Sequence, residues 1–237
     1  MAQAGIHGLA GMAVRKLAPQ KEWLMLGIVL GNILPDADNL AVAAATIIGR
    51  STEGLHRTFT HNLFFVLGLI LVGYVAARVL HQPRLGNLGL GLGIGAAMHI
   101  TLDLLIWFNG VEILWPIPSW VNFWSAVAVP EWFAKLLMPM EFLFLGLFLW
   151  MILVRAQKLG TDTAMIRGGR IGASVLFALF VVFLVLVYTL ERGFLVPYGA
   201  VYLLSLAWVA VLVIRMRETV DSGPRLREKG RDIISHE

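Results

Sequence analysis

The sequence predicts an all-α, polytopic membrane protein: a helical bundle of about six crossings with a broken or re-entrant N-terminal segment. Composition is the first reason, because 58% of the 237 residues are hydrophobic, only 14% are charged and the mean hydropathy is +0.78, well above a soluble domain. The second reason is a series of apolar runs of about 20 residues, the length that crosses a bilayer as a helix. The third is an uneven division of basic residues between the loops.

The crossings can be assigned from the N-terminus onward. Residues 4–17 predict a short helix that lacks the long apolar core of a signal peptide. Residues 22–49 are apolar but contain LPDAD, and proline disfavours helix in the residue before it, so we expect a break after Leu34. This segment is either one broken crossing or a re-entrant hairpin. Five runs predict single crossings: 62–80, 85–108, 132–154, 171–190 and 194–214.

Basic residues orient the predicted bundle. With 22–49 counted as one crossing, fifteen of the 19 Lys and Arg residues lie in residues 1–21, in the loops at 78–84 and 155–170, and in the C-terminal tail. The positive-inside rule therefore predicts cytoplasmic termini. We expect one integral membrane domain over residues 1–216 and a charged cytoplasmic tail over 217–237. The net charge of +4 has the same origin, and no nucleic-acid partner is expected.

Two ionisable residues lie inside an apolar run. His99 and Asp103 are four residues apart within 85–108, so on a helix their side chains share one face. Ionisable groups at membrane depth are costly and usually functional. The two side chains can bind one divalent metal ion, or they can form a structural hydrogen bond with each other; the spacing alone leaves both readings open.

Further polar residues belong to the same predicted end of the bundle, the non-cytoplasmic end. Asp36 and Asp38 interrupt the broken segment, either as solvent-facing turn acids or as metal-binding or catalytic carboxylates. His56, Arg57 and His61 lie just before the helix expected at 62–80. Arg57 is either an interfacial anchor or a clamp for phosphate.

The remaining features narrow the chemistry. Thr58 or Thr60 is expected to cap the helix that begins near residue 62. His7, in the short N-terminal helix, is ambiguous on its own, while His81 and His236 lie in a basic loop and in the tail, where no special chemistry is expected. The chain has no cysteine, which excludes thiolate metal sites and disulfides. Any metal must be held by imidazole or oxygen ligands.

Taken together, these motifs resemble the YdjM family of inner-membrane, metal-dependent hydrolases. The resemblance rests on His7, LPDAD at 34–38, HRTFTHN at 56–62, HITLD at 99–103 and the segment IWFNGVEILWPIP at 106–118, and it covers about residues 1–120. The family is distantly similar to zinc-dependent phospholipase C and nuclease proteins, which implies phosphoester chemistry. Thr58 and Asn62 stand where family members often carry Gly and Ser, so substrate contacts could differ.

The resemblance and the residue types together imply a membrane-bound hydrolase that uses a metal-activated water on a lipid or other phosphoester. Zinc is the expected ion and manganese a second possibility. Asp36 or Asp38 would act as general base, and Arg57 would bind the anionic substrate. The predicted metal ligands are drawn from His7, Asp36, Asp38, His56, His61, His99 and Asp103.

Two other classes remain open and two are disfavoured. A metal-ion transporter would also place Asp and His in a broken membrane helix, and a structural membrane protein could be stabilised by a bound metal. Hydrolysis by the purified protein, or metal uptake into liposomes, would separate these classes from the enzyme. An intramembrane metalloprotease would need HExxH, and a phosphatidate-type phosphatase a PSGH-like run; both are absent from the sequence.

Overall fold

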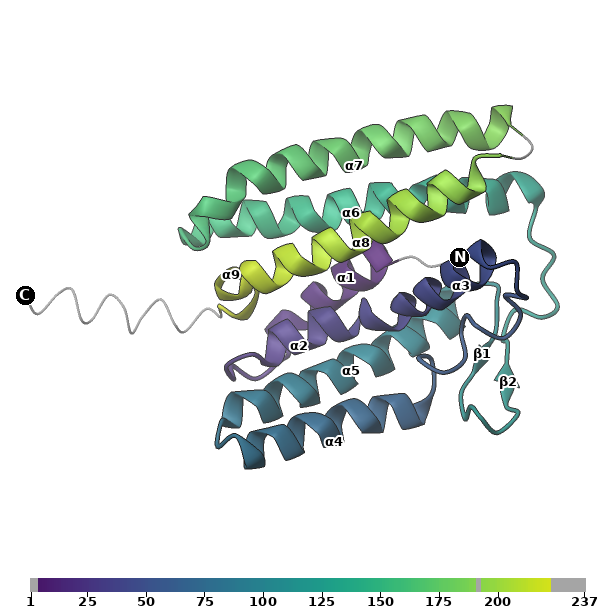
Figure 1. Cartoon of the computed structure of the whole chain (residues 1–237). Coiled ribbons are helices and arrows are strands. Elements are labelled where there is room, and N and C mark those ends of the chain that lie inside the picture. The colour runs from purple at the N-terminus through teal and green to yellow at the C-terminus, as the bar shows by residue number, and fades with distance from the viewer. Residues whose placement is uncertain (1–3, 191–192, 223–237) are drawn as a thin grey trace, which may run out of the picture.

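The computed structural model of the chain describes residues 4–190 and 193–222, and it confirms the predicted fold class. The long helices run side by side as a bundle, with a small β-hairpin near one end (Figure 1). The α-helices are α1 (Ala4–Ala13), α2 (Leu24–Gly31), α3 (Asn39–Ile47), α4 (Leu63–Val79), α5 (Pro83–Ile106), α6 (Glu131–Leu159), α7 (Thr163–Thr189), α8 (Leu195–Arg215) and α9 (Arg217–Asp221). Two 3-10 helices, η1 (Val14–Lys16) and η2 (Leu34–Asp38), and two antiparallel strands, β1 (Val111–Glu112) and β2 (Trp120–Val121), complete it.

Among the described residues, four helices are long and apolar enough to cross a membrane: α5, α6, α7 and α8. The predicted break near Leu34 is present but lies just before this residue, between Gly31 and Leu34: α2 and the segment Leu34–Ile47 are bent by 48° and together pass the same test as a broken span or a re-entrant loop. The described part of the chain therefore has four or five candidate spans. The sixth expected crossing is α4, whose 17 residues stand at the short end of the range that crosses a bilayer.

The close packing of α5 against α2 positions the polar site. Gly91 and Gly95 of α5 lie against the α2 backbone, and a Cβ added at Gly95 would stand 2.7 Å from the backbone nitrogen of Asn32. Small residues let two membrane helices approach to backbone contact. Because His99 follows Gly95 by about one turn of helix, this contact brings the His99 side chain next to the end of α2 and to η2.

The short helix α1 lies inside the bundle. It packs against α6 and α2, and His7 and Ala4 have no exposed surface. A Cβ at Gly8 would stand 3.0 Å from the ring of Phe148 in α6. Helix α1 is therefore a buried element that places His7 in the interior of the bundle.

At the end of the bundle away from the β-hairpin, α9 packs against the start of α2. The Asp221 carboxylate accepts hydrogen bonds from the backbone N–H groups of Trp23 (2.8 Å) and Leu26 (3.0 Å). Thr219 and Val220 are fully buried. Residues 217–221, assigned to the tail by the sequence analysis, therefore pack against the bundle, and residues 223–237 lie outside the described part of the chain.

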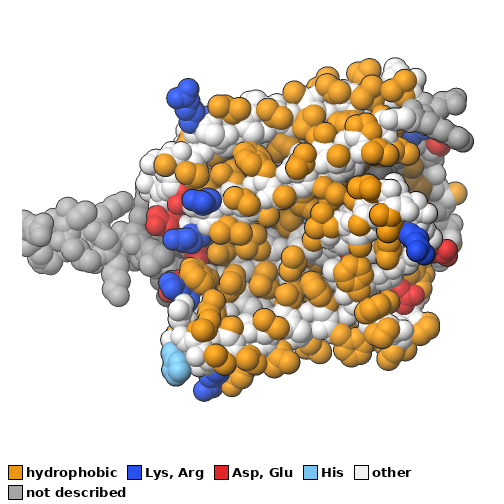
Figure 2. Space-filling view, in the orientation of Figure 1, with side chains coloured by type: hydrophobic (Ala, Val, Ile, Leu, Met, Phe, Trp, Pro, Cys, Tyr) orange, Lys and Arg blue, Asp and Glu red, His pale blue; other side chains and the backbone are white. Residues whose placement is uncertain are grey.

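The surface is consistent with a bilayer environment. Hydrophobic side chains cover most of the middle of the face in Figure 2, and charged side chains gather toward its ends, most of them at the end that carries α9. Large apolar residues on α4 and α7, such as Leu71 and Val181, are more than half exposed. Such a broad exposed apolar surface is expected where lipid replaces water.

Candidate metal centre

The structure gathers the site residues predicted from the sequence into one buried cluster. Four segments supply them: α1, η2, the loop between α3 and α4, and the last two turns of α5. The cluster lies in the half of the bundle nearer the β-hairpin, away from α9 (Figure 1). Its members, each within 4 Å of another, are His7, Asp36, Asp38, His56, Arg57, His61, His99 and Asp103.

The backbone at the end of α2 fixes the orientation of His99. Its Nδ1 lies 2.8 Å from the carbonyl oxygen of Asn32. A carbonyl can only accept, so Nδ1 carries the proton and donates the bond. In the neutral ring, Nε2 is then left with a lone pair, and it faces the centre of the cluster.

A carboxylate orients His61 in the same way. Its Nδ1 lies 3.2 Å from Oδ2 of Asp38, an acceptor when ionised, so Nδ1 donates and Nε2 carries a lone pair. The Nε2 atoms of His61 and His99 are 3.2 Å apart, and both rings have no exposed surface. Two lone pairs facing each other in a buried space repel unless a cation or a proton lies between them.

Two carboxylate oxygens approach the same point. Oδ1 of Asp36 is 3.8 Å from Nε2 of His99, and Oδ2 of Asp103 is 3.7 Å from Nε2 of His61 and 3.8 Å from Nε2 of His99. Ligands about 2.0–2.1 Å from a tetrahedral zinc ion are about 3.3 Å from one another. The measured pairs, 3.2–3.8 Å apart, have separations that suit ligands of one ion, and Asp36, His61 and His99 form a group whose ligand atoms all lie within 4.8 Å of one another.

Asp38 differs from Asp36 because protein donors already occupy its oxygens. His56 Nδ1 lies 2.8 Å from its Oδ1, and the backbone N–H of Arg57 donates to its Oδ2 at 3.0 Å. His61 and Thr60 also reach Oδ2, both at 3.2 Å. Asp38 thus orients two histidines, whereas Oδ2 of Asp36 is buried without a hydrogen-bond partner among the described residues.

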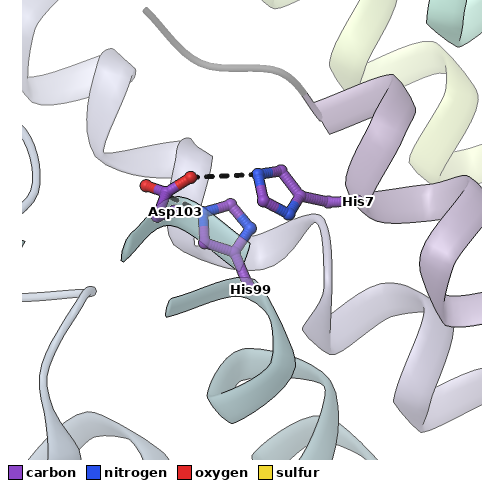
Figure 3. Close-up of side chains that lie close together, drawn as sticks. All are labelled: His7, His99 and Asp103. Carbon is purple, nitrogen blue, oxygen red and sulfur yellow. Dashed lines mark hydrogen bonds and ion pairs between the residues drawn. The ribbon is translucent and has the colours of Figure 1, made fainter. Parts of the chain in front are cut away.

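Asp103 connects the cluster to α1 and to Arg57. Figure 3 shows His7 reaching across from α1 toward Asp103 and lying beside His99. The His7 and His99 rings stack at 3.7 Å between centroids, and His7 Nε2 lies 3.1 Å from Oδ1 of Asp103. Arg57 Nη2 lies 3.2 Å from the other oxygen, Oδ2. Together, His7, His99 and Asp103 form a second group of side chains that could hold a metal ion.

The cluster is closed to solvent except at one edge. Asp36, Arg57 and Asp103 are each at most 3% exposed, whereas the His56 side chain is 23% exposed. Burial lowers the pKa of His56, although its hydrogen bond to Asp38 acts in the opposite direction. His56 is therefore the member of the cluster that a molecule outside the protein meets first.

The cap of α4 differs from the prediction. Asn62, not Thr58 or Thr60, is the N-cap residue, and its side chain accepts a hydrogen bond from Phe65 N at 2.8 Å. Thr60 instead donates to the carbonyl oxygen of Pro35 at 2.9 Å, which ties the loop to η2. Thr58 donates to the Gly54 carbonyl oxygen, so the side chains of Thr58 and Asn62 both stabilise local backbone.

Sequence reasoning missed two contributors near the cluster. One is Asn32, whose role rests on its backbone carbonyl and so leaves no signal in the side-chain pattern. The other is Glu141 of α6, which is fully buried. A lone carboxylate inside the apolar run 132–154 was a signal that could have identified Glu141.

The chain matches a known protein family. The family model described as YdjM inner membrane protein matches residues 1–192, which include all four segments that build the cluster. Neither curated proteins nor solved structures gave a match to the chain.

Proposed function

The chain belongs to the YdjM inner membrane protein family, and from this membership and the geometry of the cluster we propose that it is a membrane-bound, metal-dependent hydrolase of phosphoesters. The observation that carries the proposal is the pair of imidazole lone pairs 3.2 Å apart, flanked by buried carboxylates. A donor set of two imidazole nitrogens and two carboxylate oxygens suits zinc, and manganese is a second candidate.

Each residue has a distinct role in this proposal. Asp36, His61, His99 and Asp103 would hold the ion, while Asp38 and the Asn32 carbonyl orient the two histidines. When bound, such an ion supplies an activated water near neutral pH and polarises the substrate oxygen. His7 would hold Asp103 in place through its 3.1 Å contact.

Proton transfer would use Asp36 and His56. Hydrolysis joins the water oxygen to phosphorus and breaks the bond to the leaving oxygen, so the water must lose a proton and the leaving oxygen must gain one. Oδ2 of Asp36 is buried without a hydrogen-bond partner among the described residues and would take the first proton. His56, whose side chain is 23% exposed, would exchange protons with the outside.

Arg57 has a double role in this arrangement. Its guanidinium balances the charge of Asp103 at 3.2 Å and donates to the carbonyl oxygen of Asn109 at 3.2 Å. Its Nε is buried without a hydrogen-bond partner in the described chain. That remaining donor can meet a phosphate oxygen that enters the cluster.

The test combines metal analysis with a panel of phosphoesters, including phospholipids, using protein purified in detergent. His99→Ala should remove both retained metal and hydrolysis while the protein remains inserted, because deleting a polar group from a span favours insertion. His81→Ala changes another histidine, one on the exposed surface between α4 and α5, and should behave as wild type. Full metal content and activity in His99→Ala would refute the assignment.

A second candidate function has one supporting observation. The helix break places Asp36 and Asp38 inside a membrane segment, as in transporters whose broken helices bind ions. Metal uptake into liposomes that contain the protein, without hydrolysis of any phosphoester, would favour a metal-ion transporter. Retention of metal with neither activity would favour a metal-stabilised structural protein.

A further inference from the structure

An apolar groove lies on the other side of η2 from the metal centre. Its volume is about 400 Å³, and it is lined by the stretch from Leu30 to Leu40, by Leu92 of α5 and by α8 between Leu203 and Ile214. Within η2, Asp36 and Asp38 belong to the polar cluster, while Leu34 and Ala37 line the groove. One short 3-10 helix, η2, therefore separates the groove from the metal centre.

The lining of this groove restricts what can bind there. Every lining side chain is Leu, Ile or Ala, so a polar headgroup or a peptide backbone would lose its hydrogen bonds without replacement. A helix from another protein, about 10 Å across, is too wide for a space of about 400 Å³. A hydrocarbon chain has no hydrogen bonds to lose and is narrower than a helix, so it is compatible with this groove.

The length of the groove agrees with this occupant. The lining residues of α8 run from Leu203 to Ile214, a rise of about 17 Å along a helix. An acyl chain that fills one leaflet has about the same length, because half of the hydrocarbon core of a bilayer is about 15 Å thick. Both walls of the groove belong to segments that qualify as membrane spans, so the groove opens at lipid depth.

We propose that this groove holds one acyl chain of the lipid whose phosphoester is hydrolysed at the metal centre. The proposal rests on the proposed function and adds the substrate class: a membrane lipid that is anchored by its chain. Leu40, which lines the groove, follows Asp38 by two residues. A chain in the groove would thus bring its polar end to the depth of the cluster, near the exposed edge of His56.

The first experiment measures chain binding without activity. The purified protein is reconstituted in vesicles containing a phosphatidylethanolamine with a diazirine at the end of one acyl chain, irradiated and digested for mass spectrometry. Adducts on the groove residues of α8, which are Leu203, Leu206, Ala207, Ala210 and Ile214, should exceed those on the exposed Val181 and Val185 of α7 several-fold. Ala207→Trp fills the groove and should remove the excess, whereas Ala200→Trp, an equally large change at an exposed position of the same helix outside the groove, should keep it. Equal labelling of α7 and α8, or equal loss in both variants, would overturn the groove assignment.

The second experiment links the groove to hydrolysis. Ala207→Trp should lower the hydrolysis of a long-chain phospholipid at least tenfold, while metal content and the hydrolysis of a dibutyryl analogue stay at the wild-type level. An equal loss for both substrates would refute a role in chain binding. If the wild-type protein hydrolyses neither substrate, the hydrolase proposal fails, and the labelling experiment alone still decides whether the groove binds an acyl chain.

Discussion

Replacing Gly95 by alanine tests whether helix packing sets the geometry of the metal centre. A Cβ at this position would stand 2.7 Å from Asn32 N and 2.8 Å from the carbonyl carbon of Gly31, and would come closest to the Ile28 carbonyl oxygen. All three atoms are backbone, so no side chain can rotate away. Helix α5 must move from α2 by about 0.7 Å to bring the Asn32 contact to 3.4 Å, and further to relieve the contact with the Ile28 oxygen.

This displacement affects both stability and metal binding. Overpacking of this kind costs about 1–3 kcal/mol, which corresponds to a fall in Tm of about 2–12 °C for a chain of this size. The bond between His99 Nδ1 and the Asn32 carbonyl, 2.8 Å long, would lengthen beyond hydrogen-bond range. Loss of such a supporting contact weakens metal affinity by about 10–100-fold.

The assay is thermal unfolding of the protein in detergent together with titration by Zn²⁺. Gly68→Ala is the matched control, because it is also a glycine within a helix of the bundle and a Cβ there meets nothing within 4 Å. The control should keep its Tm and its metal affinity. If Gly95→Ala binds Zn²⁺ as tightly as the wild-type protein, the α2–α5 contact does not set the geometry of the site.

Further predictions address individual contacts. Asp36→Ala should abolish metal retention, whereas Asp38→Asn should only weaken it about 10–100-fold, because Asp38 orients the ligands; equal loss in the two variants, measured by metal analysis, would contradict this division. Asp221→Ala should lower the free energy of unfolding by about 1 kcal/mol through loss of its bonds to the start of α2, and an unchanged Tm would count against it. Cysteines introduced at the exposed positions Trp120 and Glu218 should be labelled from opposite sides of the membrane, since the hairpin and α9 lie at opposite ends of the bundle; labelling from one side would refute the predicted topology. Free Zn²⁺ at 100 times its Kd should stabilise the protein by about 2.7 kcal/mol, an effect that a chelator should reverse in the same unfolding assay.

Run lengths in the sequence predicted the membrane helices closely because apolar length is what a bilayer selects. The runs at 62–80 and 194–214 correspond to Leu63–Val79 and Leu195–Arg215. Helices α6 and α7 are longer than predicted, since their charged ends, such as Arg155 and Arg167, continue the helix beyond the apolar run. The docking of α9 could not be predicted, because it depends on Asp221 reaching a helix start 195 residues away.

The candidate site was predictable as a set of residues but not as a set of roles. Costly ionisable groups in apolar runs identified Asp36, His99 and Asp103 without structural information. The different environments of Asp36 and Asp38 follow from the turn of η2, which no spacing rule describes. The contribution of Asn32 comes from its carbonyl oxygen, a group that every residue carries.

The buried position of α1 has a consequence for biosynthesis. His7 is made well before α6, yet α1 packs against α6, which begins more than 120 residues later at Glu131. While a chain is being synthesised, α1 therefore has no α6 to cover it until the later helix has entered the membrane. Because α1 is held in place by α6, we expect the contact between His7 and Asp103 to become stable only after α6 has entered the membrane. A nascent chain arrested before residue 131 would carry the three motifs of η2, the loop and α5 but would lack the support that holds His7 among them.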